Sequence, residues 1–288
     1  MGSPCEIQLY AKDARQAEKA FQAVVADVER LERRYSRYRS DSFLSEINRL
    51  ATVQGEIEVD AETASLLDYA TTCYQESDGL FDISSGLLRQ AWNFKSPQLP
   101  ETEQLQQLLE RIGWQKLQWQ SPHLRFPALG MELDFGGIVK EYAADRADSL
   151  CRTAGIRHGA INLGGDIKII GPHPNGTPWR IGIRHPRHKQ AVLTTVLMFK
   201  GAMASSGDYE RCLVIDGKHY GHILNPKTGW PVSHLASVSV VADFCVIAGS
   251  ASTIALLKET EGPGWLQSLG LEHLWVDLCG NQGGSLVR

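Results

Sequence analysis

The sequence lacks several features that would identify whole classes of protein. Its 29 basic and 33 acidic side chains leave a net charge of -4, so no excess of positive charge indicates a nucleic-acid partner. No apolar run approaches the roughly 18 residues that cross a bilayer. The first residues carry neither a basic segment nor a long apolar one. We therefore expect no nucleic-acid partner, no membrane span and no signal peptide.

Paired cysteine motifs are also missing. The six cysteines are scattered, and no C-x-x-C pair occurs among them. This pattern argues against a zinc site and against a dense disulfide framework. Because free thiols fit a reducing compartment best, we expect a cytoplasmic protein.

The common nucleotide-binding and nucleophile motifs do not occur either. The stretch GGDIKIIG (164–171) does not read G-x-G-x-x-G, and the pattern after it is not helical. No G-x-x-x-x-G-K-[ST] loop and no G-x-S-x-G elbow is found. A P-loop is therefore excluded.

What the sequence does contain is a group of helices followed mostly by strands. Helical periodicity and caps predict helices over 14–35 behind Asp13, after Asp41 or Ser42, and over 60–79, 102–113, 139–154, 246–258 and 263–269. In the first of these, Ala17, Phe21, Val24, Val28, Leu31 and Tyr35 form one apolar face. From residue 114 onward segments with strand character become frequent, among them 124–135. This order predicts an α+β fold, with residues 1–288 as a single domain.

Four glycine clusters with polar neighbours stand out, at 79–86, 134–140, 162–167 and 204–211. Glycine allows positive φ and close approach of a ligand, and backbone N–H groups in such turns bind anions. One such cluster is weak evidence, because glycine turns are common in sheet proteins. Four in one chain suit a ligand with a long phosphate-bearing body.

The stretch LDFGGIVKEYAADR (133–146) puts a cation at a helix start. Asp134 and a Gly-Gly pair precede the helical pattern, and Lys140 falls in its first turn. The helix macrodipole favours acids there. A negatively charged group above the helix N-terminus would explain the lysine.

A second informative stretch is HYGHILNPKTGWPV (219–232). Asn-Pro-Lys-Thr-Gly is strong turn chemistry, and His222 comes just before it. Histidine titrates near neutral pH, so His222 is a candidate general base or phosphate contact. Its spacing is equally typical of a hydrogen-bonded structural histidine.

Together and in this order, seven stretches resemble the FAD:protein FMN transferase family, the ApbE-type flavin transferases. SRYRSDSFLSEINR (36–49) is similar to the family's S-x-Y-R-x-D-S-x-L-S-x-x-N, and GLFDISSGLLRQAW (79–92) to G-x-F-D-x-x-x-G-x-L-x-x-x-W. LDFGGIVKEYAADR is similar to D-L-G-G-I-A-K-G-Y-A-x-D. The remaining four are MGSPCEIQLYA (1–11), INLGGDI (161–167), SSGDYER (205–211) and HILNPKTGWPV (222–232). No single motif is decisive, and seven in register are strong evidence.

The resemblance implies an enzyme that transfers the FMN part of FAD to a Thr or Ser hydroxyl of a target protein and releases AMP. It implies a divalent cation, usually Mg²⁺. The implied fold is one α+β domain with a mixed or antiparallel sheet core and flanking helices, related to the T-fold. Two alternatives stay open. The same site could use water and act as an FAD pyrophosphatase, or the chain could bind FAD without catalysis.

The resemblance also implies roles for single residues. His222 would take the proton of the acceptor hydroxyl or orient the phosphate. Asp134 would hold the ribose or the base of FAD, and Lys140 would lie beside the pyrophosphate. The implied FAD contacts are Met1, Leu80, Phe81, Asp82, Asp134, Lys140 and Val232. The implied metal ligands are Gly137, Thr253 and Ser252.

Two positions depart from the family pattern. In CVIAGSASTIALLK (245–258), Gly249 stands where the family's C-x-x-A-D-A-x-x-T-A-L has an acid that helps bind the metal. Asn225 likewise replaces the acid of an L-D-P sequence. Because Mg²⁺ prefers sites with one or two carboxylates, we expect weak binding of the ion alone and stronger binding with FAD. We also expect Gly249→Asp to tighten it.

Overall fold

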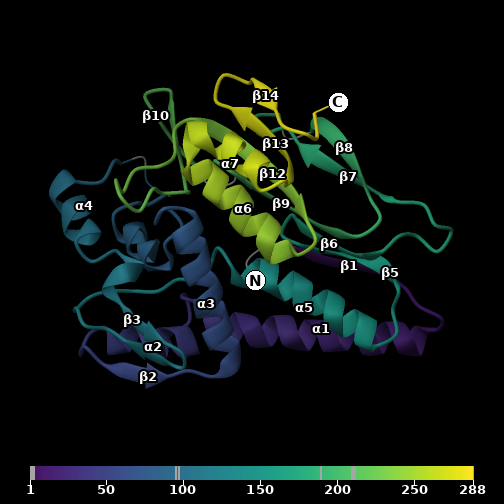
Figure 1. Cartoon of the computed structure of the whole chain (residues 1–288), viewed down its shortest axis with the longest axis horizontal. Coiled ribbons are helices and arrows are strands. Elements are labelled where there is room, and N and C mark those ends of the chain that lie inside the picture. Colours follow the sequence, from purple (N-terminus) through teal and green to yellow (C-terminus); the bar gives the residue numbers. More distant parts are fainter. Residues whose placement is uncertain (1–3, 95, 97, 189, 209–211, 288) are drawn as a thin grey trace.

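The largest element of the fold is a seven-stranded sheet in which every neighbouring pair of strands runs antiparallel (Figure 1). The computed structural model that shows it describes residues 4–94, 96, 98–188, 190–208 and 212–287. Across the sheet the strands are β1 (Cys5–Tyr10), β5 (His158–Leu163), β6 (Asp166–Gly171), β9 (Gly201–Gly207), β12 (Leu235–Ala242), β13 (Glu272–Asp277) and β14 (Gln282–Gly283). Successive side chains of each strand point to opposite faces.

Two helices cover one face of this sheet. α5 (Val139–Thr153) and α6 (Cys245–Leu257) pack against its central strands β5, β6, β9 and β12. α1 (Ala14–Tyr35) lies alongside α5, and α7 (Gly262–Ser268) follows α6 and contacts β13 (Figure 1). A hairpin of β7 (Trp179–Arg184) and β8 (Val192–Met198) shares a second apolar cluster with strands β6, β9 and β13.

Small residues let α6 lie close to its neighbours. Its sequence is apolar or small on every side, and Ala248, Gly249 and Ser252 are buried. A helix without a polar face is stable only in the interior. Its first turn is held from α5, where the Asp145 carboxylate accepts hydrogen bonds from the backbone N–H groups of Cys245 (2.8 Å) and Val246 (3.0 Å).

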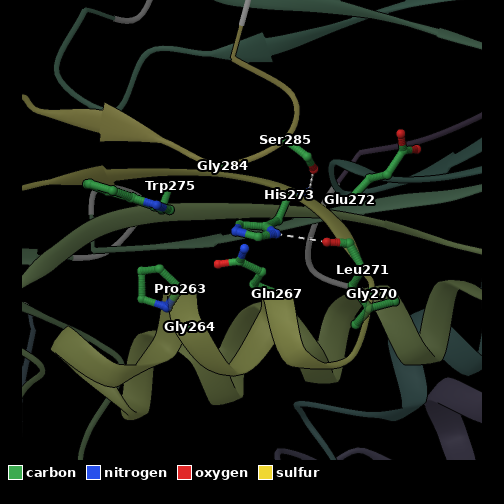
Figure 2. A pocket seen from close by; sticks show the side chains of 10 residues that line it. All are labelled: Pro263, Gly264, Gln267, Gly270, Leu271, Glu272, His273, Trp275, Gly284 and Ser285. Carbon is green, nitrogen blue, oxygen red and sulfur yellow. Dashed lines mark hydrogen bonds between the residues drawn. The ribbon is translucent and has the colours of Figure 1, made fainter.

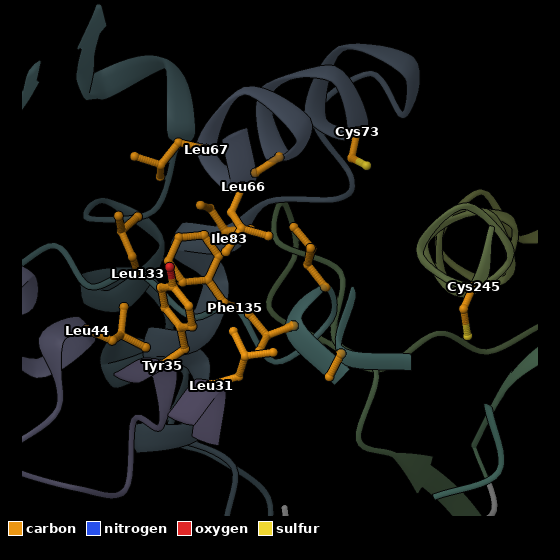
Figure 3. Close-up of a cluster of buried hydrophobic side chains, with 14 of the residues drawn as sticks. Leu31, Tyr35, Leu44, Leu66, Leu67, Cys73, Ile83, Leu133, Phe135 and Cys245 are labelled. Carbon is orange, nitrogen blue, oxygen red and sulfur yellow. The ribbon is translucent and has the colours of Figure 1, made fainter. Parts of the chain in front are cut away.

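Much of the rest of the chain packs beside the sheet around one apolar core (Figure 3), and a smaller cluster holds Leu87, Leu88, Leu105, Leu108 and Ile112. Tyr35 and Phe135 meet there edge to face at 5.4 Å between ring centroids, with Leu31, Leu44 and Leu133 around them. The elements are α2 (Phe43–Leu50), α3 (Ala61–Glu76), α4 (Thr102–Leu109), the 3₁₀ helices η1 (Ile83–Gln90), η2 (Trp114–Lys116) and η3 (Glu259–Glu261), the small sheet β2 (Glu56–Glu58), β4 (His123–Arg125) and β3 (Gln118–Gln120), and the hairpin β10 (Cys212–Ile215) and β11 (Lys218–Gly221).

The α+β prediction is confirmed, and so are two predicted caps. The Asp13 carboxylate accepts from the Gln16 N–H at 2.7 Å, and the Ser42 hydroxyl accepts from the Ser45 N–H at 3.0 Å. The predicted apolar face of α1 is wrong at Phe21, which is 45% exposed. Cys73, Cys151, Cys212, Cys245 and Cys279 are free thiols. Among the described residues, no helix combines the length and apolar character that crossing a membrane needs.

The predicted strand over 124–135 is wrong beyond Arg125. Residues 126–138 form a loop that buries Phe126, Met131, Leu133, Phe135 and Ile138, and a side chain rather than a neighbouring strand pairs part of its backbone. Asn48 of α2 accepts from the Leu133 N–H at 2.8 Å and donates to the Leu133 carbonyl at 2.9 Å. The predicted helix over 102–113 ends at Leu109, and Gly113 beyond it has a φ of +144°.

Candidate functional site

Two of the glycine clusters, 79–86 and 134–140, are in direct contact. The ring of Phe81 lies over Gly137, where an added Cβ would be 3.3 Å from the Phe81 Cζ. An added Cβ on Gly86 would lie 2.7 Å from the Cβ of Asp134. The Asp134 N–H donates to the Ile83 carbonyl at 2.8 Å. Glycine is therefore required at position 86 by the close approach of the two segments.

The Asp134 carboxylate is held by two groups of the protein. One oxygen accepts from the Gly136 N–H at 2.9 Å, and the other pairs with the Arg37 guanidinium. A ligand hydroxyl bound by Asp134 would therefore share the carboxylate with Arg37. Arg37 was not among the predicted site residues, although it lies inside the quoted motif SRYRSDSFLSEINR.

Lys140 connects 134–140 to the third cluster, 162–167. Its ammonium nitrogen lies 2.7 Å from Asp166 Oδ2 and 3.9 Å from Glu141 Oε1. Asp166 begins β6 and is 2% exposed. A buried carboxylate thus already balances the cation in the first turn of α5. The lysine at this position does not by itself require an anionic ligand.

The other predicted FAD contacts that the structure describes are buried or half-buried. Asp82 is used inside the fold: its carboxylate accepts from the Ser84 N–H (2.8 Å), the Ser84 hydroxyl (2.7 Å) and the Trp114 N–H (3.0 Å). Burial raises the pKa of Asp82. Leu80 is half-buried, Phe81 and Val232 are buried, and Met1 lies outside the described residues.

The two predicted hydroxyl ligands of the metal meet the fourth cluster, 204–211. The Ser206 hydroxyl of β9 lies 2.9 Å from the Thr253 hydroxyl and 2.7 Å from that of Ser252. Ser252 is fully buried and donates to the Gly249 carbonyl at 2.9 Å, whereas Thr253 is half-buried. Thr253 is therefore the better placed of the two. Residues 209–211 of this cluster lie outside the described residues.

His222 is half-buried and lies next to the same cluster. An added Cβ on Gly221, its neighbour, would be 2.8 Å from the Cβ of Asp208. The two terminal guanidinium nitrogens of Arg187 donate to the Asp208 carboxylate, at 2.6 and 2.7 Å, and hold it in place. The Val232 N–H donates to the Ile223 carbonyl at 3.1 Å, which brings Val232 alongside the His222 segment.

Asn225 forms the turn after His222. Its side-chain oxygen accepts from the backbone N–H groups of Lys227 at 2.9 Å and of Thr228 at 3.3 Å. An aspartate would accept the same two hydrogen bonds. The asparagine therefore keeps the turn that the usual acid would form.

Glu141 lies between Lys140 and Gly249 and was not among the predicted site residues. It is 7% exposed, and burial, with the nearby Asp166 carboxylate as a smaller cause, raises its pKa to about 8. An added Cβ on Gly249 would lie 2.5 Å from Glu141 Cγ. An aspartate at position 249 would therefore have to displace the Glu141 side chain, and the tighter metal binding expected of Gly249→Asp stays a prediction. The one sequence signal was Lys-Glu where the family pattern reads Lys-Gly.

A separate cavity of about 520 Å³ lies between α7 and β13 (Figure 2). Gln267, His273 and Trp275 are among its lining residues, and none of the lining residues belongs to the predicted site. His273 Nδ1 lies 2.8 Å from the Leu271 carbonyl, and the His273 N–H donates to the Ser285 hydroxyl at 3.0 Å. These hydrogen bonds fix one wall of the cavity. The cavity shares no lining residue with the four glycine clusters.

Comparison with known proteins gives one consistent result. A family model described as the ApbE family matches residues 1–275. A protein of Chlamydia pneumoniae named FAD:protein FMN transferase is 32% identical over 79% of this chain and 72% of its own length. A Klebsiella pneumoniae protein of the same name is 30% identical over 84% and 75%. The ApbE protein of Thermotoga maritima has a similar structure, with a TM-score of 0.89 at 29% identity, covering 100% of this chain and 96% of its own. The apo flavinyl transferase ApbE of Pseudomonas stutzeri gives 0.87 at 27%, over 98% and 90%.

Proposed function

The chain belongs to the ApbE family, and we propose from this that it cleaves the pyrophosphate of FAD and joins the FMN part to a Thr or Ser hydroxyl of an acceptor protein. It is accordingly an FAD:protein FMN transferase. The acceptor oxygen forms a new bond to the FMN phosphorus, the bond from that phosphorus to the AMP oxygen breaks, and AMP leaves. The match over residues 1–275 is the observation that carries this proposal.

The chain's own residues supply position and charge, on which phosphoryl-type transfer mostly depends. We assign to His222 the removal of the acceptor proton. Lys140 would lie beside the pyrophosphate, where an ion pair at about 4 Å gains about 4 kcal/mol at an effective dielectric of about 20, before desolvation. Since Lys140 is paired with Asp166, the phosphate would share the ammonium with that carboxylate. Asp134 would hold a ribose or base group, and Leu80, Phe81, Asp82 and Val232 would line or support the site.

The carbonyl, hydroxyl and carboxylate oxygens in this region suit a divalent cation such as Mg²⁺. No group of three His, Cys, Asp or Glu side chains in the described part of the chain is arranged to hold a metal. The ligands would instead be the Gly137 carbonyl and the Thr253 hydroxyl, with Ser252 turned to inner partners, and oxygens of FAD. The buried Glu141 Oε2, without a hydrogen-bond partner among the described residues, adds an acceptor suited to a hard cation. When bound, the ion would neutralise charge on the pyrophosphate.

We also propose that residues 1–288 form one such domain, because α1, α3, α5 and α6 contribute to one core. The free thiols of Cys73, Cys151, Cys212, Cys245 and Cys279 support a reducing, cytoplasmic setting.

Replacing His222 with alanine should lower the transfer rate about 100-fold while FAD affinity changes less than threefold, since a general base acts in the transition state. Single-turnover kinetics and flavin fluorescence titration measure the two quantities. His234→Ala, a histidine change close by in sequence, is the control. An unchanged rate would make His222 a structural residue of its turn.

Replacing Asp134 with asparagine should weaken FAD binding about tenfold, because the amide keeps an oxygen for the Gly136 N–H but loses the charge that accepts ligand hydroxyls. Titration calorimetry measures the affinity, and a thermal melt reports the fold. Asp41→Asn, which changes an exposed carboxylate paired with Arg39, is the matched control. A large fall in Tm with unchanged affinity would assign Asp134 to structure alone.

The proposed reaction is tested by incubating the protein with FAD, Mg²⁺ and a panel of candidate acceptor domains. A transferase yields a fluorescent flavin band that survives denaturing electrophoresis. FMN and AMP formed without such a band would identify a pyrophosphatase. Intact FAD after long incubation would identify a binding protein.

A further inference from the structure

Glu141 is a buried acid without a full complement of partners. It is 7% exposed, and its Oε2 atom has no hydrogen-bond partner among the described residues. A buried carboxylate in that state must take up a proton or a cation, because an unpaired charge in the interior is costly. The surroundings of Glu141 therefore decide whether it is a neutral core residue or a ligand.

Each of the two lysines near Glu141 lies closer to another carboxylate than to Glu141. Lys168 of β6 lies 3.1 Å from Asp145 Oδ1, and Lys140 lies 2.7 Å from Asp166 Oδ2. The second contact of Lys140, to Glu141, is 3.9 Å long. Three carboxylates thus share two ammonium groups, and the local excess is one negative charge whenever Glu141 is ionised. A bound cation would balance it.

The register of α5 against α6 aligns Glu141 with two predicted metal ligands. Asp145 contacts the N–H groups of Cys245 and Val246, and one turn earlier in α5 Glu141 abuts Gly249, one turn later in α6. The two helices are therefore antiparallel at steps of about four residues. Thr253 lies one turn further along α6, and Gly137 lies just before the start of α5 at Val139.

The Glu141 side chain occupies the space between the helices that a side chain at position 249 would need. A Cβ added to Gly249 would lie 2.5 Å from Glu141 Cγ and 3.1 Å from Glu141 Oε1. A carboxylate carried by either helix would therefore reach the same seam, but the two cannot both be accommodated without rearrangement. In this chain the carboxylate comes from α5.

We propose that Glu141 is the carboxylate ligand of the divalent cation, acting with the Gly137 carbonyl and the Thr253 hydroxyl. Glu141 thereby supplies the charge that position 249 lacks. This assignment rests on the proposed function, because it concerns the cation that accompanies FAD. It also explains how the site can keep a protein carboxylate although Gly249 and Asn225 both carry none.

The test is Mn²⁺ binding, followed by electron paramagnetic resonance with and without FAD, in the wild type and in Glu141→Gln. Glutamine preserves shape and removes the charge, so Mn²⁺ affinity in the presence of FAD should fall at least about tenfold. Asp148→Asn is the matched control, since it changes another buried acid of α5 that pairs with Arg152 at 2.8 Å. Its Mn²⁺ affinity should equal that of the wild type. A melting curve for each variant verifies the fold.

Exchanging the two residues gives an independent test. Glu141→Gly should lose Mn²⁺ affinity, and Gly249→Asp should lower Tm because its side chain meets Glu141. The double variant Glu141→Gly/Gly249→Asp should regain both Tm and Mn²⁺ affinity to within about threefold of the wild type, since one carboxylate again occupies the seam.

The outcomes separate this assignment from the proposed function. Unchanged Mn²⁺ affinity in Glu141→Gln, with flavin transfer intact in the wild type, would overturn the assignment and make Glu141 a neutral core acid. A double variant that folds but binds Mn²⁺ no better than Glu141→Gly would also overturn it. A wild type that transfers flavin without binding Mn²⁺ would refute the metal requirement itself.

Discussion

Replacing Lys140 with methionine is expected to weaken FAD binding and slow flavin transfer, with a combined loss of at least about 100-fold in kcat/KM. The variant removes the ammonium assigned to the pyrophosphate and keeps most of the aliphatic stem. It also removes the cation 2.7 Å from Asp166, which is 2% exposed, so some loss of Tm is expected. Initial rates over a range of FAD concentrations, with a melting curve, measure both effects.

Lys140→Arg keeps the charge and should recover part of the activity, and Lys19→Met on the exposed side of α1 should change neither quantity. A lower Tm with unchanged FAD affinity and rate would mean that Lys140 serves only to balance Asp166. That result would also remove the ion pair with the pyrophosphate from the mechanism.

Replacing Asp82 with alanine should have the largest effect on stability. Three donors lose their acceptor, and two of them are backbone N–H groups in buried surroundings, at Ser84 and Trp114. The expected cost is about 3 kcal/mol in the free energy of unfolding, since each unsatisfied buried donor costs about 1–3 kcal/mol. In a chain of this size that corresponds to roughly 6–12 °C in Tm.

Differential scanning calorimetry checks this expectation, with Asp41→Ala as the control. The Asp41 side chain is 68% exposed and pairs at the surface with Arg39, which is 46% exposed. Exposed ion pairs contribute about 0–1 kcal/mol, so the control should melt within a few degrees of the wild type. Asp82→Ala with an unchanged Tm and lost FAD binding would reverse the interpretation and make Asp82 a ligand contact.

Local signals in the sequence were sufficient for the helices and their caps. Asp13 and Ser42 stand at helix starts with the donors they need three residues later, so the pattern carries its own geometry. The strands were harder. The sequence of β9 looks like a glycine-rich loop, and β13 was not predicted. Both are strands because of partners elsewhere in the chain: β9 pairs with β6 and β12, and β13 pairs with β12.

For the site as well, features within one segment could be predicted, whereas contacts between distant segments could not. The glycine clusters could be found from sequence, since glycine marks close approach wherever it occurs. The Arg37–Asp134 pair and the contact of Glu141 with Gly249 could not be found from sequence, because they depend on which segments the fold brings together. Residues 126–135 likewise looked like part of a strand, whereas the backbone of Leu133 pairs with the side chain of Asn48, 85 positions away.

The central claim is that one FMN is joined to an acceptor hydroxyl for each FAD that is cleaved. The most direct measurement is the ratio of AMP released to FMN bound covalently in an acceptor domain, with the modified residue located by mass spectrometry. We predict a ratio of one, a phosphoester on a single Thr or Ser, and no bound flavin after that residue is changed to valine or alanine. AMP released with an equal amount of free FMN, and no phosphoester on the acceptor, would contradict it.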